Sequence, residues 1–415
     1  MTTDLLIAGA GASGLMAAIC AARSGVRVTV LEQKKEPGKK ILATGNGKCN
    51  YTNLLQNPSC YRSSAEEALV TDIRERFSCE DTIGFFRELG IVPFQKNGYV
   101  YPYSGQASSV LQVLLLELKR LNVTVCTDEP VKEIRPGKNG EFDVISASMK
   151  WHAKKVILAC GGKASPKLGS DGSGYELAKR LGHQILTVAP ALTGLKADGM
   201  DFKMTAGVRT PAKVDLYIDD RLVCSDCGEL QLTAYGISGI PVFQISRYAT
   251  LALKKRQSVT AVIQYVPDLF ENMEQLEEEL RNRRKPEKTC GELLTGFLNQ
   301  KLALALLSFA GIKAEKSSVE LSDKQLKQLA RTIWGQKLTI TGDTGMEHAQ
   351  VSAGGVCLEE IWPETMESRK MPGIFLSGEI LDVDGICGGY NLQWAWTTGY
   401  LAGNAAARAI TGRKP

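Results

Sequence analysis

The first thirty residues alternate short apolar runs with a glycine-rich turn. Residues 5–8 form an apolar run suited to a buried parallel strand, and residues 15–24 have the alanine-rich composition of a helix. Gly25 stands where such a helix would end, and residues 26–31 form a second apolar run. The pattern therefore predicts a strand–helix–strand unit at the start of the chain.

Apolar spacing also predicts the elements that follow. Ser64 and Glu67 form a capping-box pattern that predicts a helix to about residue 77. Apolar residues at helical spacing predict another helix over 110–121. Further helices are expected over 78–89, 171–182 and 389–410, and strands over 123–126, 131–134, 142–146, 155–159 and 373–376.

Short alternating segments begin at about residue 191 and predict an inserted antiparallel β-domain. Its strands are expected over 213–218, 222–224, 229–233, 259–266 and 337–340. Residues 269–334 are rich in Leu, Glu and Lys at helical spacing, which predicts a small helical subdomain, either a cap over a substrate cleft or a stabilising appendage. We therefore expect a discontinuous first domain (1–190 plus 355–415), a β-domain (191–268 plus 335–354) and a helical subdomain (269–334).

The glycine turn between the first strand and helix has the spacing of a dinucleotide-binding motif. Gly9 permits the tight turn, Gly11 lets the backbone approach a pyrophosphate, and Gly14 lets the helix pack on the strand. The helix N-terminus, with roughly half a positive charge, favours the phosphates. Glu32 closes the second strand, where it is placed to accept hydrogen bonds from ribose hydroxyls. A flexible turn is the alternative, but strand, helix, strand and acid occur in the expected order.

Residues 33–53 are small, polar and glycine-rich, with interleaved lysines. Such a segment makes poor core but offers many backbone donors to an anionic or polar ligand. We expect a binding loop; a surface linker is the alternative.

These motifs together resemble the bacterial BaiN/RdsA (YhiN-like) family of NAD(P)/FAD-dependent oxidoreductases. The resemblance spans both ends of the chain, and departs from the family at Ser352 and Ala353, where the family usually has Thr and Gly. The segments that carry it are 38–40, 44–50, 52–53, 353–356, 377–379, Asp382, Gly385 and 388–392.

The resemblance implies an α/β fold: a Rossmann-like FAD-binding domain of the glutathione-reductase type, interrupted by the β-domain and the helical subdomain. It also implies that Val131 meets the adenine through its backbone and that the helix after Gly389 aims its N–H groups at the flavin. The cofactor-binding residues expected are Gly9, Gly11, Ala12, Ser13, Gly14, Glu32, Gln33, Lys39, Lys40, Thr44, Gly45, Asn46, Gly47, Cys49, Asn50, Val131, Gly161, Gly162, Gly378, Glu379, Gly389, Tyr390, Asn391 and Leu392.

Three residues are candidates for catalysis. Tyr101 and Ser104 lie in a tyrosine-rich segment that the resemblance places near flavin and substrate, although aromatic residues at strand spacing are equally typical of packing. His348 lies in a family-like signature, where it could protonate substrate or be structural.

Disulfide reductases of the glutathione-reductase type carry a second dinucleotide motif and two neighbouring cysteines after the first binding loop. This chain has no second motif and only Cys49 at that place. We therefore expect NAD(P)H to dock transiently over the flavin, without a nicotinamide domain of its own.

Cys224 and Cys227 form a C-x-x-C at a predicted hairpin. A thioredoxin-like pair needs its first cysteine at a helix N-terminus, and no second pair or nearby histidine completes a metal site. We expect no metal, and chance or a weak accessory role for this pair.

Composition narrows the remaining classes. The 415 residues carry a net charge of +5, with Lys and Arg interspersed among Asp and Glu, so we expect no nucleic-acid partner. Eleven cysteines without a secretory signal predict a cytoplasmic protein with reduced thiols, and no stretch predicts a membrane span. The sequence carries no signal for oligomeric state.

We therefore expect an FAD-dependent oxidoreductase that passes hydride from flavin N5 to a small organic acceptor. The resemblance implies a conjugated enone of the bile-acid or steroid type. Two alternatives are a tRNA-modifying flavoenzyme, which should show a concentrated basic face, and a non-catalytic flavin sensor or electron-transfer protein.

Overall fold

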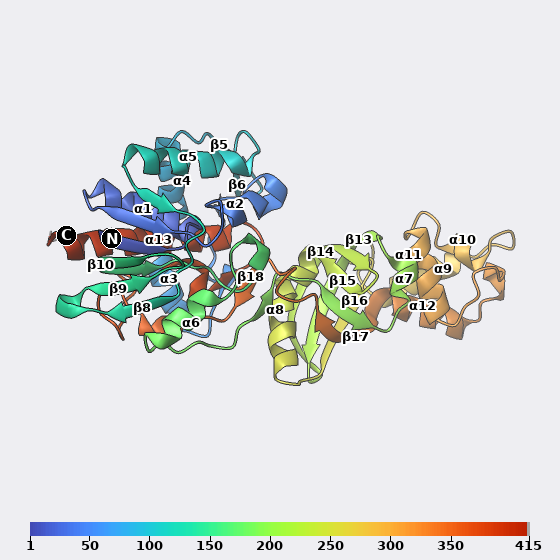
Figure 1. The fold of residues 1–415 in the computed structure, drawn as a ribbon. Helices are drawn as coiled ribbons and strands as arrows, with labels where there is room; N and C mark the ends of the chain where they lie inside the picture. The colour runs from blue at the N-terminus through green and yellow to red at the C-terminus, as the bar shows by residue number, and fades with distance from the viewer. Residues whose placement is uncertain (413–415) are drawn as a thin grey trace. The chain divides into compact units, whose positions relative to one another are not determined.

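The computed structural model describes residues 1–412, which fold into two units (Figure 1). Unit 1 combines Met1–Val188 with Gln350–Pro415, and unit 2 is Ala189–Ala349. Each unit encloses its own cluster of buried apolar side chains. The three-part division expected from the sequence stays a prediction.

Unit 1 is built on a mixed sheet in the order β7-β2-β1-β10-β9-β8. Strand β19 pairs with the C-terminal end of β10, at residues 156–158. Strand β1 runs parallel to both β2 and β10, and its central residues Leu5, Leu6 and Ile7 are fully buried. Apolar side chains on both faces are typical of a parallel strand covered by helices on each side. The strands of this unit are β1 (Thr2–Ala8), β2 (Val28–Leu31), β3 (Thr52–Asn53), β4 (Tyr61–Arg62), β5 (Pro93–Lys96), β6 (Tyr99–Pro102), β7 (Thr124–Cys126), β8 (Glu133–Pro136), β9 (Phe142–Ile145), β10 (Lys150–Leu158), β18 (Val351–Ala353), β19 (Ile374–Leu376) and β20 (Asp384–Gly385).

Two helices from opposite ends of the chain, α1 and α13, pack against each other beside this sheet. A Cβ on Gly399 or Gly403 of α13 would collide with the α1 backbone at Ser13 or Ala17, so small residues set this close approach. The helices of unit 1 are α1 (Ala12–Arg23), α2 (Lys39–Ala43), α3 (Glu67–Glu75), α4 (Cys79–Glu88), α5 (Ala107–Arg120), α6 (Ser173–Arg180) and α13 (Tyr390–Thr411), with 3-10 turns η1 (Thr44–Gly47), η2 (Pro58–Cys60), η3 (Lys138–Gly140), η4 (Pro166–Leu168), η6 (Leu358–Glu360) and η7 (Gly378–Ile380).

Unit 2 is a closed antiparallel barrel in the order β12-β15-β14-β13-β16-β17, accompanied by helices. The helices expected over 269–334 are present, and Asn272, Thr289 and Ser322 cap three of them with their side chains. The elements of this unit are β11 (Ala189–Ala191), β12 (Leu195–Asp198), α7 (Phe202–Thr205), β13 (Arg209–Ile218), β14 (Arg221–Thr233), β15 (Gly236–Gly239), α8 (Ile240–Lys254), β16 (Val259–Gln264), α9 (Met273–Asn282), α10 (Cys290–Leu293), α11 (Gln300–Phe309), η5 (Ser318–Glu320), α12 (Asp323–Gly335) and β17 (Gln336–Asp343).

Several local predictions are wrong, each for a reason visible in tertiary contacts. The segments 222–224 and 229–233 form one strand, β14, because β13 pairs with it along ten residues. Ser64 does not cap α3, because this helix begins at Glu67 with Glu66 at its N-cap position. The Ser64 backbone N–H instead donates to the buried Asp382 carboxylate at 2.8 Å. No helix was expected over residues 240–253, where α8 lies, and the strand expected over 131–134 begins only at Glu133.

No helix among residues 1–412 is both long and apolar enough to cross a bilayer.

Candidate functional site

The glycine turn after β1 gives each of its three glycines a different physical constraint. Gly9 has φ +107°, and a Cβ there would collide with the carbonyl oxygen of Ala159. A Cβ on Gly14 would collide with the carbonyl oxygen of Gly9. A Cβ on Gly11 would meet no atom within 4 Å, so open space adjoins the N-terminus of α1 at this point. Packing therefore requires two of these glycines, and the third leaves room for a ligand.

The first turn of α1 carries no acidic side chain and receives no side-chain cap from Gly11. Ala12 and Ser13 begin this turn, and the Ser13 hydroxyl donates to the carbonyl oxygen of Ser377 at 3.3 Å. Unpaired N–H groups at a helix N-terminus attract anions. The turn thus presents an anion-binding end toward the open space beside Gly11.

Glu32 is 8% exposed and both of its carboxylate oxygens accept backbone hydrogen bonds at 2.8 Å, one from Ala10 and one from Lys34. This carboxylate therefore holds the glycine turn to the end of β2, and each oxygen keeps a further lone pair for a ribose hydroxyl. The neighbouring Gln33 amide donates to the carbonyl oxygen of Gly169. Residues 165–169 thereby join the rim of the candidate site.

An ion pair joins the two ends of the chain across this region. The Lys40 ammonium lies 2.7 Å from one carboxylate oxygen of Glu379 and also donates to the carbonyl oxygen of Ala164 at 3.3 Å. The other Glu379 oxygen accepts from the Ser352 backbone N–H at 3.0 Å. Lys39, by contrast, is exposed.

The binding loop turns through three consecutive left-handed residues, Gly45, Asn46 and Gly47, all exposed. Thr44 precedes them, and its carbonyl oxygen accepts from the N–H of Cys49. Burial raises the pKa of the Cys49 thiol to about 12, so it stays protonated and is poorly suited to thiolate chemistry.

The end of this loop is bonded to the start of α13. Thr52 donates to the side-chain oxygen of Gln393 at 2.6 Å, and Tyr390 donates to the carbonyl oxygen of Leu55 at 2.9 Å. Asn391 bonds both backbone groups of Gly385 at 2.8 Å. Gly389 has φ +94° and Leu392 is half-buried in the first turn.

Asn50 also belongs to this junction, since its side-chain oxygen accepts from the Val100 N–H at 3.2 Å and adjoins Gly389. The loop and the helix N-terminus, more than 330 residues apart in the sequence, thus form one surface.

Gly161, Gly162 and Gly378 are needed for packing inside the protein. A Cβ on Gly161 would lie 2.8 Å from the Ser170 hydroxyl, and one on Gly378 would crowd the Ser13 side chain. A Cβ on Gly162 would lie within 3.0 Å of oxygens from Glu379, Ser352 and Tyr175. Sequence analysis missed Ser352 and Tyr175 as members of this group.

Ser352 could have been found, because it stands where the sequence departs from the resembled family. Its hydroxyl accepts from the backbone N–H groups of Lys163 at 2.8 Å and Ala164 at 3.0 Å. It therefore fixes the turn that follows β10.

Val131, the residue expected to meet the adenine, lies half-buried between β7 and β8, outside both strands.

Of the three candidates for catalysis, Tyr101 lies in β6, whereas Ser104 and His348 lie outside the helices and strands. The Tyr101 ring lies 3.9 Å from the Cβ position of Gly45, and partial burial, with Tyr99 and Cys387 nearby, raises the pKa of its phenol. The Ser104 hydroxyl hydrogen-bonds Ser109 at 2.8 Å near the start of α5. His348 is exposed and belongs to unit 2, whereas the other predicted site residues belong to unit 1.

The C-x-x-C motif lies within a strand, so the predicted hairpin at this point is wrong. Cys224 pairs with Leu216 and Cys227 with Lys213 in the β13–β14 ladder. Residues three apart on a strand point to opposite faces and are separated by about 10 Å, too far for a disulfide. Among residues 1–412, no three His, Cys, Asp or Glu side chains gather in a metal-binding group.

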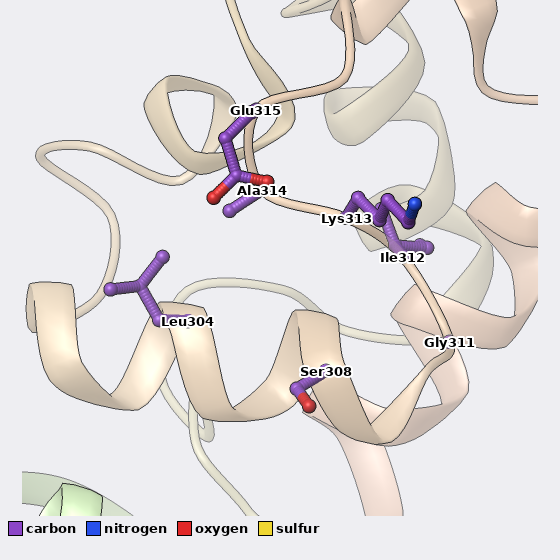
Figure 2. A pocket seen from close by; sticks show the side chains of 7 residues that line it. All are labelled: Leu304, Ser308, Gly311, Ile312, Lys313, Ala314 and Glu315. Atoms are coloured by element: carbon purple, nitrogen blue, oxygen red, sulfur yellow. The ribbon is translucent and has the colours of Figure 1, made fainter.

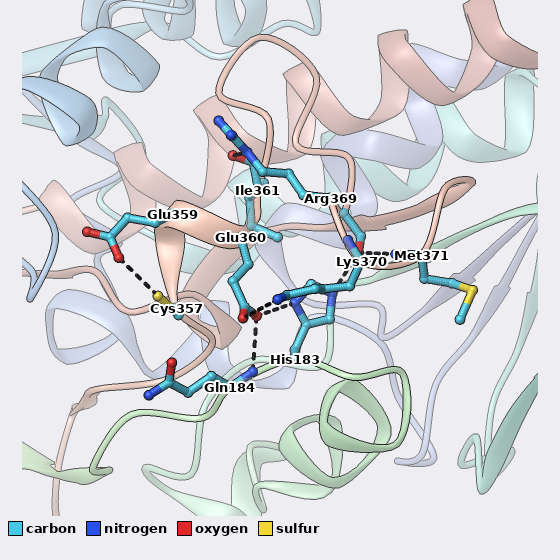
Figure 3. Close-up of polar contacts among 10 residues, drawn as sticks. His183, Gln184, Cys357, Glu359, Glu360, Ile361, Arg369, Lys370 and Met371 are labelled. Atoms are coloured by element: carbon cyan, nitrogen blue, oxygen red, sulfur yellow. Dashed lines mark hydrogen bonds and ion pairs between the residues drawn. The ribbon is translucent and has the colours of Figure 1, made fainter.

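Figure 3 shows His183 at the centre of a buried polar chain. Its ring nitrogens lie 2.9 Å from the Glu360 carboxylate and 2.8 Å from the Ser368 hydroxyl. The arrangement has the order of a Ser–His–Glu triad, but Ser368 is 1% exposed and its oxygen accepts the N–H groups of Lys370 and Met371. Since no substrate reaches this oxygen, the hydrogen bonds among Ser368, His183 and Glu360 have a structural role.

Figure 2 shows a surface pocket of about 340 Å³ in unit 2, at the end of α11. It is lined by Leu304, Ser308, Gly311, Ile312, Lys313, Ala314 and Glu315. None of the predicted site residues lies among them, so this hollow is separate from the candidate site.

The residues of unit 1 fit FAD, the cofactor expected from the sequence, at several points. Open space adjoins Gly11 at a helix N-terminus, and the Glu32 carboxylate, bonded to Ala10 of the glycine turn, can accept from hydroxyl groups. The Ser377 hydroxyl is fully buried and has no hydrogen-bond partner among residues 1–412. An unpaired buried hydroxyl beside the glycine turn is expected where a ligand supplies the partner.

Comparison with known proteins agrees with this geometry. The chain is 45% identical over 403 residues to a 3-dehydro-bile acid delta(4,6)-reductase of Clostridium scindens, covering 97% of this chain and 98% of that protein. It is 31% identical to a ribosomal RNA dihydrouridine synthase of Haemophilus influenzae over 98% of this chain and 99% of that one. A ribosomal RNA dihydrouridine synthase of Escherichia coli is 30% identical, with 96% of each chain covered.

A flavocytochrome c3 fumarate reductase structure shares the fold, with a TM-score of 0.50, 16% identity, and coverage of 99% of this chain and 78% of that one. The family profile described as HI0933-like protein Rossmann domain matches residues 3–405. The expected fold class and family are thereby confirmed. The chain therefore belongs to the HI0933-like Rossmann-domain family and is an oxidoreductase.

Proposed function

We propose that this protein uses FAD, with NAD(P)H as electron donor, to reduce a conjugated enone on a steroid-like ring system. The observation that carries the proposal is the 45% identity, over nearly the whole chain, to a 3-dehydro-bile acid delta(4,6)-reductase. The free thiols of all eleven cysteines suit the reducing cytoplasm in which we place the reaction.

Reduction of one carbon–carbon double bond takes a hydride and a proton, and oxidation of one NAD(P)H supplies the two electrons. FAD, when bound, accepts and passes on the hydride at its N5 atom. The N–H groups at the start of α13, after Gly389, favour negative charge on a ligand placed before them. Glu32, Lys40 and Glu379 would hold the polar parts of the cofactor.

Tyr101 is the proposed proton donor. A tyrosine phenol carries its proton at neutral pH, and the Tyr101 ring lies against the binding loop at Gly45. Ser104 and His348 are secondary candidates for the same role. We place the nicotinamide over the flavin, since the chain carries no second dinucleotide motif.

The dihydrouridine synthases among the relatives make RNA the second candidate substrate. The charge arrangement opposes it in the most basic segment, 281–288. Arg281 pairs with Glu277, Arg283 pairs with Glu279, and Arg284 donates to the carbonyl oxygen of Leu321. These guanidinium groups are already engaged within unit 2, which leaves few charges there for phosphates.

The test is an anaerobic reoxidation assay with photoreduced holoprotein. A steroid 4-en-3-one should restore the absorbance of oxidised flavin, while its saturated analogue and an RNA hairpin should not. Tyr101→Phe should slow this reoxidation by about 10² to 10⁴, the usual contribution of a positioned general acid. Reoxidation by RNA alone would overturn the proposal in favour of the RNA-modifying alternative.

Steady-state oxidation of NADH and NADPH by the same preparation separates an enzyme from a flavin sensor. We expect turnover that depends on the enone. Negligible turnover with both nucleotides, together with slow enone reoxidation, would contradict the reductase.

A further inference from the structure

The β5–β6 hairpin exposes aromatic side chains. Tyr103 is 73% exposed, Phe94 is 46% exposed and Tyr99 is 37% exposed. Their rings form two pairs: Phe94 and Tyr103 meet edge to face with centroids 6.2 Å apart, and Tyr99 stacks on Tyr101 at 6.5 Å. Exposed apolar groups gathered in this way mark binding surfaces more often than scattered ones do.

Strand register places these side chains on one face of the small sheet. Phe94 lies directly opposite Tyr101, and Lys96 lies opposite Tyr99. Val100, which points to the other face, is fully buried. Residues directly opposite in an antiparallel pair project to the same side, so Phe94, Lys96, Tyr99 and Tyr101 share the exposed face.

This face is continuous with the candidate cofactor site. A ring atom of Tyr99 lies 2.9 Å from the Cβ position of Gly388, just before α13, and Tyr101 adjoins Gly45 of the binding loop. From Tyr99 to Pro102, the last residue of β6, the strand advances about 10 Å, and Tyr103 follows it directly. The aromatic face therefore leads away from the binding loop and the start of α13 over a length that suits a fused ring system.

Lys96 adds a charge to this apolar face. It is exposed and makes no ion pair with any residue of the described chain. An unpaired ammonium beside apolar rings suits a ligand with an apolar body and an anionic end.

We propose that this face, made by Phe94, Lys96, Tyr99, Tyr101 and Tyr103, binds the ring system of the acceptor, and that Lys96 holds a carboxylate on that acceptor. This proposal rests on the proposed function and adds what selects the substrate: a rigid apolar polycycle with an acidic end, lying along the hairpin with its reactive end toward Tyr99 and Tyr101.

The test measures binding to the oxidised holoenzyme by calorimetry, with two ligands that cannot be reduced: a saturated steroid carboxylate and a neutral saturated steroid. Phe94→Ser and Tyr103→Ser should weaken both ligands by about three- to tenfold, the value of one aromatic contact. Lys96→Glu should weaken the carboxylate by about fivefold and leave the neutral ligand unchanged.

Matched controls come from unit 2. Phe309 is 48% exposed, nearly the same as Phe94, and Lys255 is an exposed lysine. Phe309→Ser and Lys255→Glu should change neither dissociation constant by more than about twofold.

If wild-type protein binds the ligands and all hairpin variants bind them equally well, this proposal is wrong while the reductase function stands. If Phe94→Ser changes the oligomeric state without changing ligand affinity, the face is a protein interface and the proposal is equally overturned. If the wild type neither binds the ligands nor is reoxidised by an enone, the proposed function fails first and this inference fails with it.

Discussion

Ser368 makes three hydrogen bonds through one oxygen, at the end of the polar chain centred on His183. The hydroxyl contacts the His183 ring at 2.8 Å and accepts the backbone N–H groups of Lys370 and Met371 at 3.1 and 2.9 Å. Ser368→Ala would leave buried polar groups without partners, which costs about 1–3 kcal/mol. We expect the free energy of unfolding, measured by urea titration, to fall by this amount in Ser368→Ala. Ser308→Ala, at an exposed helical position, should change it by less than about 0.5 kcal/mol.

His183 should make the stability depend on pH. Burial lowers the pKa of its imidazole, although Glu360 acts in the opposite direction. A folded-state pKa below the unfolded value means that the unfolded chain binds the proton more readily, so stability falls as pH drops below about 6.5. The lowered pKa of the Glu360 carboxylate matters only at more acidic pH, as the pH falls through the usual range of a carboxyl group.

Urea titrations at pH 7 and pH 5 measure this dependence. The loss of stability between the two should be smaller in His183→Gln than in wild type, because glutamine does not titrate. Ser308→Ala, at an exposed position, changes no titratable group and should leave the dependence unchanged. Equal losses in wild type and His183→Gln would contradict the assignment.

At the scale of elements, the glycines of the β1–α1 turn have different roles: Gly14 is needed for folding and Gly11 for cofactor binding. Gly14→Ala drives a methyl group into the Gly9 carbonyl and should destabilise the protein by more than about 2 kcal/mol. Gly11→Ala meets open space and has ordinary extended backbone, so the apoprotein should keep its stability. The same methyl group should weaken FAD binding at least tenfold, measured by flavin fluorescence. Unchanged FAD affinity in Gly11→Ala would contradict the placement of the FAD phosphates beside Gly11.

Elements whose pattern lies within their own residues could be predicted from the sequence. Elements whose extent depends on pairing with a distant strand could not. The first strand, the glycine turn and α1 are encoded within thirty residues, since apolar runs and glycine spacing act locally. Strand β14 was expected as two pieces because its middle carries exposed polar residues, and pairing with β13 joins the two pieces into one strand.

The same distinction holds within the candidate site. The roles of Gly9, Gly11 and Gly14 follow from spacing, and the structure gives each a matching environment. The constraint on Gly162 comes from Tyr175 and from the distant Ser352 and Glu379. Only the three-dimensional fold brings these side chains together, although the departure from the resembled family at Ser352 marks one of them. The aromatic face of the β5–β6 hairpin likewise depends on register, which fixes that Phe94 lies beside Tyr101.

At the scale of the whole molecule, the sequence pattern changes at about residue 191, where short segments of alternating apolar and polar residues begin. This change coincides with the start of a unit that has its own apolar core. Apolar side chains of Ala189–Ala349 pack with one another inside the barrel and its helices. Sequence pattern missed α8 there, because its apolar residues follow a strand and a Pro at the first turn without a capping side chain. Each unit should therefore have its own cooperative unfolding transition.

This independence leads to a prediction about deletion. Within unit 1 the chain leaves and returns at neighbouring points, since a Cβ on Gly354 would collide with the carbonyl oxygen of Thr187. A Gly-Ser linker of about six residues in place of 189–349 should span this gap. Gly11, Glu32, Lys40, Ser377 and Glu379 all remain, so the shortened protein should stay yellow through gel filtration and bind FAD within about tenfold of the full chain. Fragment 189–349 should fold alone and remain colourless. A shortened protein with native circular dichroism but no flavin would show that unit 2 completes the cofactor site.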